Sequence, residues 1–322
     1  MPDTPIQDLP IDPSVAWVFP GQGAQHVGMG ADLADQSATA RAIFTAADMA
    51  LDMSLSQLCF EGPEDELTRT VNTQPAIVTH SVAALATAIE TGVITSRPAF
   101  VAGHSLGEYA ALIAAGAVSF DDGVRLVRER GRLMQEACDA EPGTMAAVLG
   151  LEPAVLRQIC DAHGAAVCNI NAPGNITIGG SVAAVEAASA AATEAGATRV
   201  VPLTVSGAFH TPLMAAAAEG LRGALQGVAF NDPRMPVISN VTATPMTAAS
   251  AFANELVDQV TMPVLWADSV AAMQAAGVTT LIEFGPGRVL SGLARRIDRS
   301  LETRNIGTAE DLLPQDSKEA GS

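Results

Sequence analysis

The stretch that decides the fold is V-A-G-H-S-L-G-E-Y-A-A-L, residues 101–112. It holds a G-x-S-x-G motif centred on Ser105, between an apolar run and a run of helix-forming residues. This order of strand, sharp turn and helix is typical of a nucleophile elbow. Gly103 and Gly107 lack a Cβ, so the strand and the helix can pass closely at the turn. The alternative is an ordinary strand–helix turn with the same letters, since a motif match alone is a hypothesis.

A serine on an elbow needs a general base, and the sequence offers five histidines: His26, His80, His104, His163 and His210. His104 adjoins the serine, but neighbours on a strand point to opposite faces, so it is a poor base. His210 follows a predicted strand, between glycine and proline, and lies downstream of the serine. Serine before histidine is the chain order of sheet hydrolases. The sequence therefore favours His210 as the base.

Composition limits the classes of partner. The chain has 322 residues, 48% of them hydrophobic, which is enough for one large domain or two unequal ones. Its formal charge is −18, from 35 acidic and 17 basic residues. Nucleic acid and anionic membranes are therefore poor partners, because the overall field repels phosphate.

The remaining composition predicts a protein of the cytoplasm. Four cysteines without a C-x-x-C spacing predict free buried thiols in a reducing compartment: Cys59, Cys138, Cys160 and Cys168. The first residues lack the features of a secretory leader, and every apolar stretch is broken before it could span a membrane. No cluster of histidine, cysteine or acidic residues has the spacing of metal ligands, so no metal is expected.

Hydrophobic periodicity predicts an α/β fold of two domains. Residues 141–205 contain the order β-α-β-β-α-β, which is the split βαβ unit of ferredoxin-like domains. We predict that this unit is inserted into a parallel-sheet catalytic domain made of residues 15–140 and 206–309. Residues 1–14 are expected to form a flexible arm, and residues 310–322 a disordered acidic tail.

Six motifs occur in an order that resembles a known family. They are F-P-G-Q-G at 19–23, T-Q-P-A at 73–76, G-H-S-L-G-E-Y at 103–109, R-G-x-x-M at 130–134, G-A-F-H at 207–210 and F-G-P-G at 284–287. Together they resemble the malonyl-CoA:acyl carrier protein transacylases of type II fatty acid synthesis and the related acyltransferases of polyketide synthases. The resemblance covers residues 15 to 300. It implies a hydrolase-like α/β domain with a ferredoxin-like insertion, in agreement with the periodicity.

The resemblance implies a catalytic dyad. Ser105 would be the nucleophile and His210 its base, and the histidine would be oriented by the backbone carbonyl of Gln259 rather than by a carboxylate. The backbone N–H groups of Gln22 and Leu106 would form the oxyanion hole.

The resemblance also implies a binding site for the acyl group. Arg130 would hold the free malonyl carboxylate as a bidentate fork, whereas its sequence position alone favours a surface arginine. Met134 and Phe209 would line the acyl pocket, and His104 would belong to the substrate-binding residues. Leu265 departs from the family pattern, which often has a polar residue there, and this puts one contact at the rim in doubt.

The implied reaction is a two-step, ping-pong transfer of malonyl from malonyl-CoA to the phosphopantetheine thiol of acyl carrier protein, through a malonyl-serine. It uses no bound cofactor. The sequence leaves three alternatives: loading of a polyketide or malonate decarboxylase carrier, a serine hydrolase or thioesterase, and a scaffold with a vestigial elbow. The first two keep the chemistry of the serine, whereas the third does not.

The carrier protein is acidic, so an acidic enzyme needs a local basic surface to bind it. Arginines concentrate near the C-terminus, at Arg288, Arg295, Arg296 and Arg299. We predict that Arg288, Arg295 and Arg296 contribute to docking. The alternative is a solvated helix end at which the dipole favours cations. The protein is expected to be a monomer.

Overall fold

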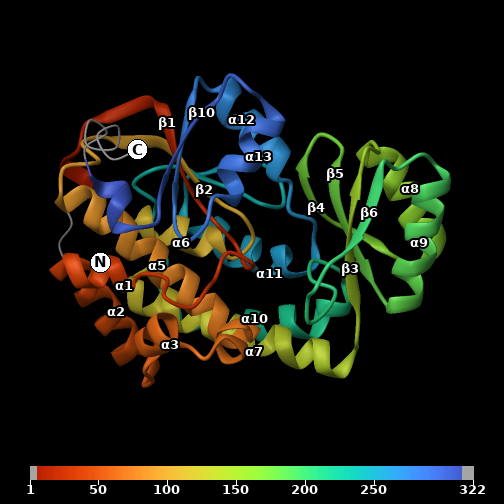
Figure 1. Ribbon diagram of the computed structural model, residues 1–322, viewed down its shortest axis with the longest axis horizontal. Coiled ribbons are helices and arrows are strands. Elements are labelled where there is room, and N and C mark those ends of the chain that lie inside the picture. Colours follow the sequence, from red (N-terminus) through yellow and green to blue (C-terminus); the bar gives the residue numbers. More distant parts are fainter. Residues whose placement is uncertain (1–5, 314–322) are drawn as a thin grey trace.

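The computed structural model describes residues 6–313 and contains two β-sheets (Figure 1). The larger sheet has the strand order β10-β9-β1-β2-β7-β8. Pairing is parallel from β10 to β7, and β8 joins antiparallel. The strands of this sheet are β1 (Ile11–Phe19), β2 (Arg97–Gly103), β7 (Val237–Ile238), β8 (Pro245–Met246), β9 (Thr280–Phe284) and β10 (Glu302–Ile306).

The centre of the larger sheet is a continuous apolar strand. The last five residues of β1 are all buried, as expected for a parallel strand covered on both faces. Trp17 and Phe19 of this strand pack on Phe284 of β9, with ring centroids 5.6 and 6.0 Å apart. The strand therefore anchors the loops that follow β1 and β9 at the same edge of the sheet.

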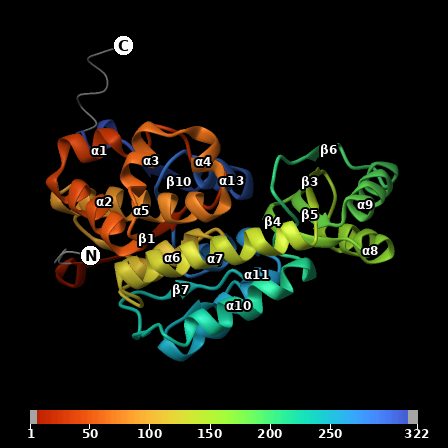
Figure 2. The same ribbon diagram turned by 90° about the horizontal axis from the view of Figure 1, so that it is seen from below.

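Helices cover both faces of the larger sheet. The long helix α7 (Phe120–Ala140) packs between α5 (Thr70–Glu90) and α10 (Ala215–Leu225), as Figure 2 shows. Ser119 begins α7 by accepting a hydrogen bond from the backbone N–H of Asp122. The other helices of this domain are α1 (Ala31–Gln36), α2 (Ala38–Leu51), α3 (Leu55–Glu61), α4 (Glu64–Thr68), α6 (Gly107–Ala114), α11 (Phe252–Thr261), α12 (Trp266–Ala275) and α13 (Val289–Ile297).

The second sheet is antiparallel and has the order β4-β5-β3-β6. Its elements follow one another along the chain as β-α-β-β-α-β, and two helices pack against it (Figure 1). They are β3 (Thr144–Leu149), α8 (Pro153–His163), β4 (Ala166–Ala172), β5 (Asn175–Gly180), α9 (Val182–Glu194) and β6 (Arg199–Pro202). The predicted fold class, a parallel-sheet domain with a ferredoxin-like unit, is confirmed.

The backbone joins the small sheet to the large domain beside β4. The N–H of Ile170 donates to the carbonyl of Val264 at 2.9 Å, and the N–H of Val264 donates to Cys168 at 2.8 Å. Asn169 and Val264 thereby form a parallel bridge between the two parts. This bridge fixes β4 next to the segment that follows α11. All four cysteines are buried and unpaired, as predicted.

The predicted arm of residues 1–14 differs from the structure over its second half. Strand β1 begins at Ile11, and a short 3-10 helix precedes it at Ile6–Asp8. Ile6 is fully buried in the main core. The polar, proline-containing composition concealed this single apolar anchor. Residues 1–5 lie outside the described part of the chain.

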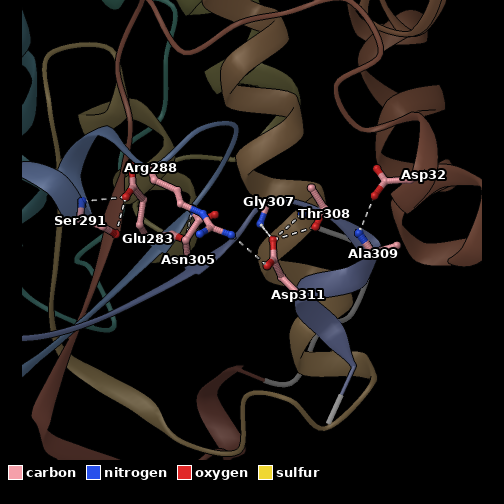
Figure 3. Close-up of polar contacts among 9 residues, drawn as sticks. All are labelled: Asp32, Glu283, Arg288, Ser291, Asn305, Gly307, Thr308, Ala309 and Asp311. Carbon is pink, nitrogen blue, oxygen red and sulfur yellow. Dashed lines mark hydrogen bonds and ion pairs between the residues drawn. The ribbon is translucent and has the colours of Figure 1, made fainter. Parts of the chain in front are cut away.

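The predicted disordered tail, residues 310–322, is wrong at its start. Residues Ala309–Leu312 form a 3-10 helix with a capping box. Figure 3 shows the buried carboxylate of Asp311 accepting hydrogen bonds from the backbone N–H groups of Gly307 and Thr308, at 3.1 and 3.0 Å. These bonds close the chain end on the loop after β10. Residues 314–322, the rest of the predicted tail, lie outside the described residues.

Within residues 6–313, no helix is long and apolar enough to cross a membrane. The same residues contain no group of three or more histidine, cysteine, aspartate or glutamate side chains that could hold a metal ion.

Candidate active site

Ser105 lies in a strained turn between β2 and α6. Its backbone φ is 50°, a left-handed conformation that is uncommon for a residue with a side chain. A Cβ on Gly103 would lie 1.9 Å from the carbonyl carbon of Gly107, and a Cβ on Gly107 would lie 2.0 Å from the oxygen of Phe19. Only glycine fits at these two positions, so the sequence G-x-S-x-G and the sharp turn require each other.

Asn240 holds this turn from the neighbouring strand. It lies two residues after β7 and is buried. Its Oδ1 accepts a hydrogen bond from the backbone N–H of Ser105 at 2.6 Å, and its Nδ2 donates to the carbonyl of Gly103 at 2.7 Å. One side chain therefore satisfies two backbone groups of the elbow that regular structure leaves unpaired.

His210 is placed to take a proton from Ser105. Its Nε2 lies 2.8 Å from the serine Oγ, and its Nδ1 lies 2.7 Å from the backbone oxygen of Gln259. A carbonyl only accepts, so Nδ1 carries the hydrogen and Nε2 presents its lone pair to the hydroxyl. Burial and, to a lesser extent, the nearby charge of Arg130 lower the pKa of His210 to about 3. The imidazole is therefore neutral and able to accept a proton near neutral pH.

Arg130 extends from α7 into the same site and is only 1% exposed. Its Nη1 donates to Oε1 of Gln74 at 2.9 Å. Its Nη2 donates to Oε1 of Gln259 at 3.0 Å and to Oγ of Ser105 at 3.1 Å. All three acceptors are uncharged oxygens, so the guanidinium is held without neutralisation of its charge. A buried cation beside the serine suits a substrate that carries an anion.

These side chains face a cavity of about 360 Å³. Residues of both domains line it. All the predicted catalytic and substrate-binding residues except Gln259 are among them, namely Gln22, His104, Ser105, Leu106, Arg130, Met134, Phe209 and His210. Gln259 is fully buried and lies behind the dyad, in contact with His210 and Arg130. The cavity thus joins a serine hydroxyl, a neutral imidazole and a cation.

The two predicted oxyanion donors are free to bind a ligand. Within the described residues, the backbone N–H groups of Gln22 and Leu106 make no hydrogen bond to the protein. Leu106 stands at the start of α6, where the helix dipole adds positive potential. Two free donors beside a serine are the arrangement that stabilises a tetrahedral oxyanion.

His104 contacts the small domain as well as the cavity. Its Nε2 lies 2.9 Å from Oδ1 of Asn171 on β4, and its ring packs on Trp266 with centroids 5.8 Å apart. Burial lowers its pKa. The ring is therefore fixed between the elbow and β4, at one wall of the cavity.

A family model described as the acyl transferase domain matches residues 16–319. The chain belongs to the acyl transferase family. The family resemblance inferred from six short motifs is therefore confirmed.

Relatives within the acyl transferase family are close. A Bacillus subtilis protein named malonyl CoA-acyl carrier protein transacylase is 46% identical over 303 residues, which is 92% of this chain and 95% of the relative. A crystal structure of the malonyl-CoA:acyl carrier protein transacylase of Xanthomonas oryzae has a TM-score of 0.89 at 44% identity, covering 94% of this chain and 96% of that one. One chain of a solved complex, described as a type II polyketide synthase acyl-carrier protein in complex with its malonyl-transacylase, matches with a TM-score of 0.89 at 40% identity, covering 93% of this chain and 97% of that one.

The predicted docking arginines lie apart from the catalytic cavity. Arg288 is 75% exposed and lies 3.9 Å from Asp311 (Figure 3), and the Nε of Arg295 donates to Thr303 at 3.2 Å. Arg295, Arg296 and Arg299 line a separate hollow with the turn between β4 and β5. Arg295 and Arg296 therefore face a surface shared by the two domains, whereas Arg288 lies beside Asp311, and a docking role for the three remains a prediction.

Four site residues escaped the analysis of the sequence: Gln74, Glu108, Asn171 and Asn240. Gln74 and Glu108 stood inside the recognised motifs without a role. Asn240 carried a usable signal, since a polar residue at the carboxyl end of a parallel strand commonly faces the active site of an α/β fold. Asn171 carried none, because its contact crosses between domains.

Substitution of Asn240 by leucine is expected to slow acylation of Ser105 and to lower the melting temperature. It leaves a buried N–H and a buried carbonyl of the elbow unpaired, at a cost of about 1–3 kcal/mol each. We expect the single-turnover rate to fall by about tenfold or more, measured by quenched flow with malonyl-CoA. Asn231→Leu, at an exposed position, is the control. A normal rate and a normal melting temperature in Asn240→Leu would contradict this account.

Proposed function

We propose that this acyl transferase moves a malonyl group from malonyl-CoA to the phosphopantetheine thiol of acyl carrier protein, through a malonyl ester of Ser105. The names of its close relatives support this substrate and this partner. The observation that carries the proposal is the cation beside the dyad: Arg130 lies 3.1 Å from the serine Oγ, which itself lies 2.8 Å from His210. A site for an acyl group with a free carboxylate needs this combination.

In the first step, Ser105 attacks the thioester carbonyl while Nε2 of His210 takes the hydroxyl proton. The backbone N–H groups of Gln22 and Leu106 hold the oxyanion, and the carbonyl of Gln259 stabilises the imidazolium through Nδ1–H. The thiol of CoA leaves with the proton from Nε2. A malonyl ester of the serine remains, with its carboxylate on Arg130.

In the second step, the phosphopantetheine thiol of the carrier gives its proton to His210 and attacks the ester. A second tetrahedral oxyanion forms on the same two donors, and the serine oxygen leaves with the proton. The reaction thus returns Ser105 to its resting state. The proposed steps involve only the chain, the malonyl-CoA thioester and the phosphopantetheine thiol of the carrier.

We also propose how the chain divides. Residues 15–140 and 206–309 would form the catalytic domain, and residues 141–205 the inserted domain that supplies one wall of the cavity. The position of strands β3 to β6 within residues 144–202 supports these boundaries. The described residues 6–14 and 310–313 are added to the catalytic domain, since Ile6 and Asp311 are buried there.

Intact-mass spectrometry of the protein after mixing with malonyl-CoA tests the proposed function. We expect one malonyl adduct that disappears when carrier protein with its phosphopantetheine arm is added, with the malonyl group then found on the carrier. Release of free malonate without transfer would instead identify a hydrolase, and absence of any adduct a scaffold. Carriers from fatty acid and polyketide systems, compared in the same assay, distinguish the two pathways.

Arg288, Arg295 and Arg296, which lie at the start and in the last turn of α13, are proposed as the docking surface for the acidic carrier. Reversal of Arg295 and Arg296 to glutamate is expected to raise the Michaelis constant for carrier protein by about tenfold at low salt, because charge complementarity governs encounter. The difference should shrink at high salt, since screening weakens exposed charges. Steady-state rates at several salt concentrations measure it.

Loading of Ser105 from malonyl-CoA should stay within about twofold in this double variant, because neither arginine lines the catalytic cavity. Arg222→Glu on α10 is the matched charge reversal on a different helix. Equal losses in both half-reactions, or the same loss in the control, would show that α13 is not the docking surface.

A further inference from the structure

Glu108 is a buried carboxyl that the reaction above does not use. It lies in the first turn of α6, three residues after the nucleophile, and is 0% exposed. Its Oε2 accepts a hydrogen bond from Nε2 of Gln259, while its Oε1 has no partner among the described residues. Burial of a carboxyl costs free energy unless the group is hydrogen-bonded. The contact with Gln259 therefore indicates where Glu108 acts.

Gln259 connects three parts of the site. Its backbone oxygen accepts from His210, and its Oε1 accepts from Nη2 of Arg130. Its Nε2 donates to the carbonyl of Ser105 at 3.0 Å and to Glu108. Every polar atom of this side chain is therefore engaged, and each contact fixes one end of the amide.

The orientation of the side-chain amide of Gln259 determines whether its oxygen or its N–H groups face the guanidinium of Arg130. In the observed direction, the amide oxygen faces the guanidinium and the amide N–H groups face two oxygens. After a flip, N–H groups would face the guanidinium, and the amide oxygen would face the carbonyl of Ser105 and the carboxyl of Glu108. The new contacts with the guanidinium and with the carbonyl of Ser105 are repulsive, and the contact with Glu108 is repulsive as long as its Oε2 is an acceptor, so Glu108 and that carbonyl select one direction.

We propose that Glu108 is a positioning residue for acyl selection: it fixes the amide of Gln259 so that Arg130 is held in the direction that receives the malonyl carboxylate. The role belongs to an acceptor oxygen rather than to a negative charge. Burial raises the pKa of Glu108 well above its ordinary value, and Glu255 raises it further, which favours the neutral carboxyl. A neutral carboxyl that carries its hydrogen on Oε1, the oxygen without a partner among the described residues, still accepts through Oε2.

Two substitutions separate the acceptor from the charge. Glu108→Met keeps the side-chain length but removes the acceptor, so kcat/KM for malonyl-CoA should fall by about tenfold, the loss expected for one hydrogen bond that orients a charged group. Acetyl-CoA has no carboxylate for Arg130, so its kcat/KM should fall by about threefold at most. Glu108→Gln retains an acceptor oxygen and should restore the malonyl-to-acetyl ratio to within about threefold of that of the unmodified protein.

A double-mutant cycle shows whether Glu108 acts through Gln259. In a Gln259→Met background, Glu108→Met should change the malonyl-to-acetyl ratio by less than about twofold, because the amide that it orients is gone. Equal loss for both acyl groups, the same loss in both backgrounds, or failure of Glu108→Gln to restore the ratio would overturn the proposal. If Glu108→Met does not fold, Gln259→Met alone must still lower the ratio, and an unchanged ratio would overturn it.

This inference rests on the proposed malonyl transfer, and different experimental results would contradict the inference and the proposed function. An unmodified protein that forms no malonyl adduct contradicts the proposed function. An unmodified protein that prefers malonyl-CoA, with the same preference in Glu108→Met, contradicts the role of Glu108 alone.

Discussion

Replacement of Ser105 by alanine is expected to abolish the malonyl adduct and to lower the turnover of carrier loading by about 10⁴-fold or more. The hydroxyl is the only group within hydrogen-bonding distance of both Nε2 of His210 and Nη2 of Arg130 among the described residues. Water in its place would not be held by the elbow and would yield no ester. Intact mass after incubation with malonyl-CoA and a radiometric transfer assay measure the two effects.

The fold should survive this substitution. Alanine differs by one oxygen, and the elbow at Ser105 is fixed through its backbone N–H by Asn240, a bond that alanine keeps. The melting temperature of Ser105→Ala should therefore equal that of the unmodified protein within a few degrees. A malonyl adduct in the folded variant would show that another side chain is the nucleophile.

The sharp turn at Ser105 could be predicted because its backbone geometry requires particular residues at fixed positions. Gly103 and Gly107 are required by contacts of 1.9 and 2.0 Å that any Cβ would make, so the elbow has a fixed pattern of letters. The ferredoxin-like unit could also be predicted, because the hydrophobic periodicity of residues 144–202 alternates between that of strands and that of helices. This pattern can be recognised without knowledge of contacts between distant residues. Arg130, Met134 and Phe209 became interpretable only through the family resemblance.

The supporting contacts could not be predicted, because they join residues far apart in the chain. Asn240 and Ser105 are 135 positions apart, and Gln259 and Glu108 are 151 apart. No local period encodes such pairs. The errors at the chain ends have a related cause. A single buried side chain attaches each end, Ile6 at the N-terminal end and Asp311 at the C-terminal end. The composition of the polar segment around each residue gives no sign of that contact.

Replacement of Arg130 by methionine is expected to change the acyl preference of the enzyme more than any other substitution considered. The guanidinium is the charged group nearest the serine, and its three acceptors are neutral. Loss of one partner of a buried ion pair costs about 3–5 kcal/mol, so kcat/KM for malonyl-CoA should fall by about 10²–10³-fold. Methionine matches the length of the apolar stem and limits the cavity that is left.

The acetyl-CoA reaction provides the internal comparison. Its acyl group offers no carboxylate, and a methyl group gains from an apolar neighbour, so acetyl loading of Arg130→Met should fall much less than malonyl loading or rise. Arg132→Met is the control on the same helix, because that arginine is exposed and pairs with Glu129 and Glu136 at the surface. It should leave the malonyl-to-acetyl ratio unchanged. Equal losses of malonyl and acetyl loading in Arg130→Met would mean that the arginine supports the elbow and does not bind the malonyl carboxylate.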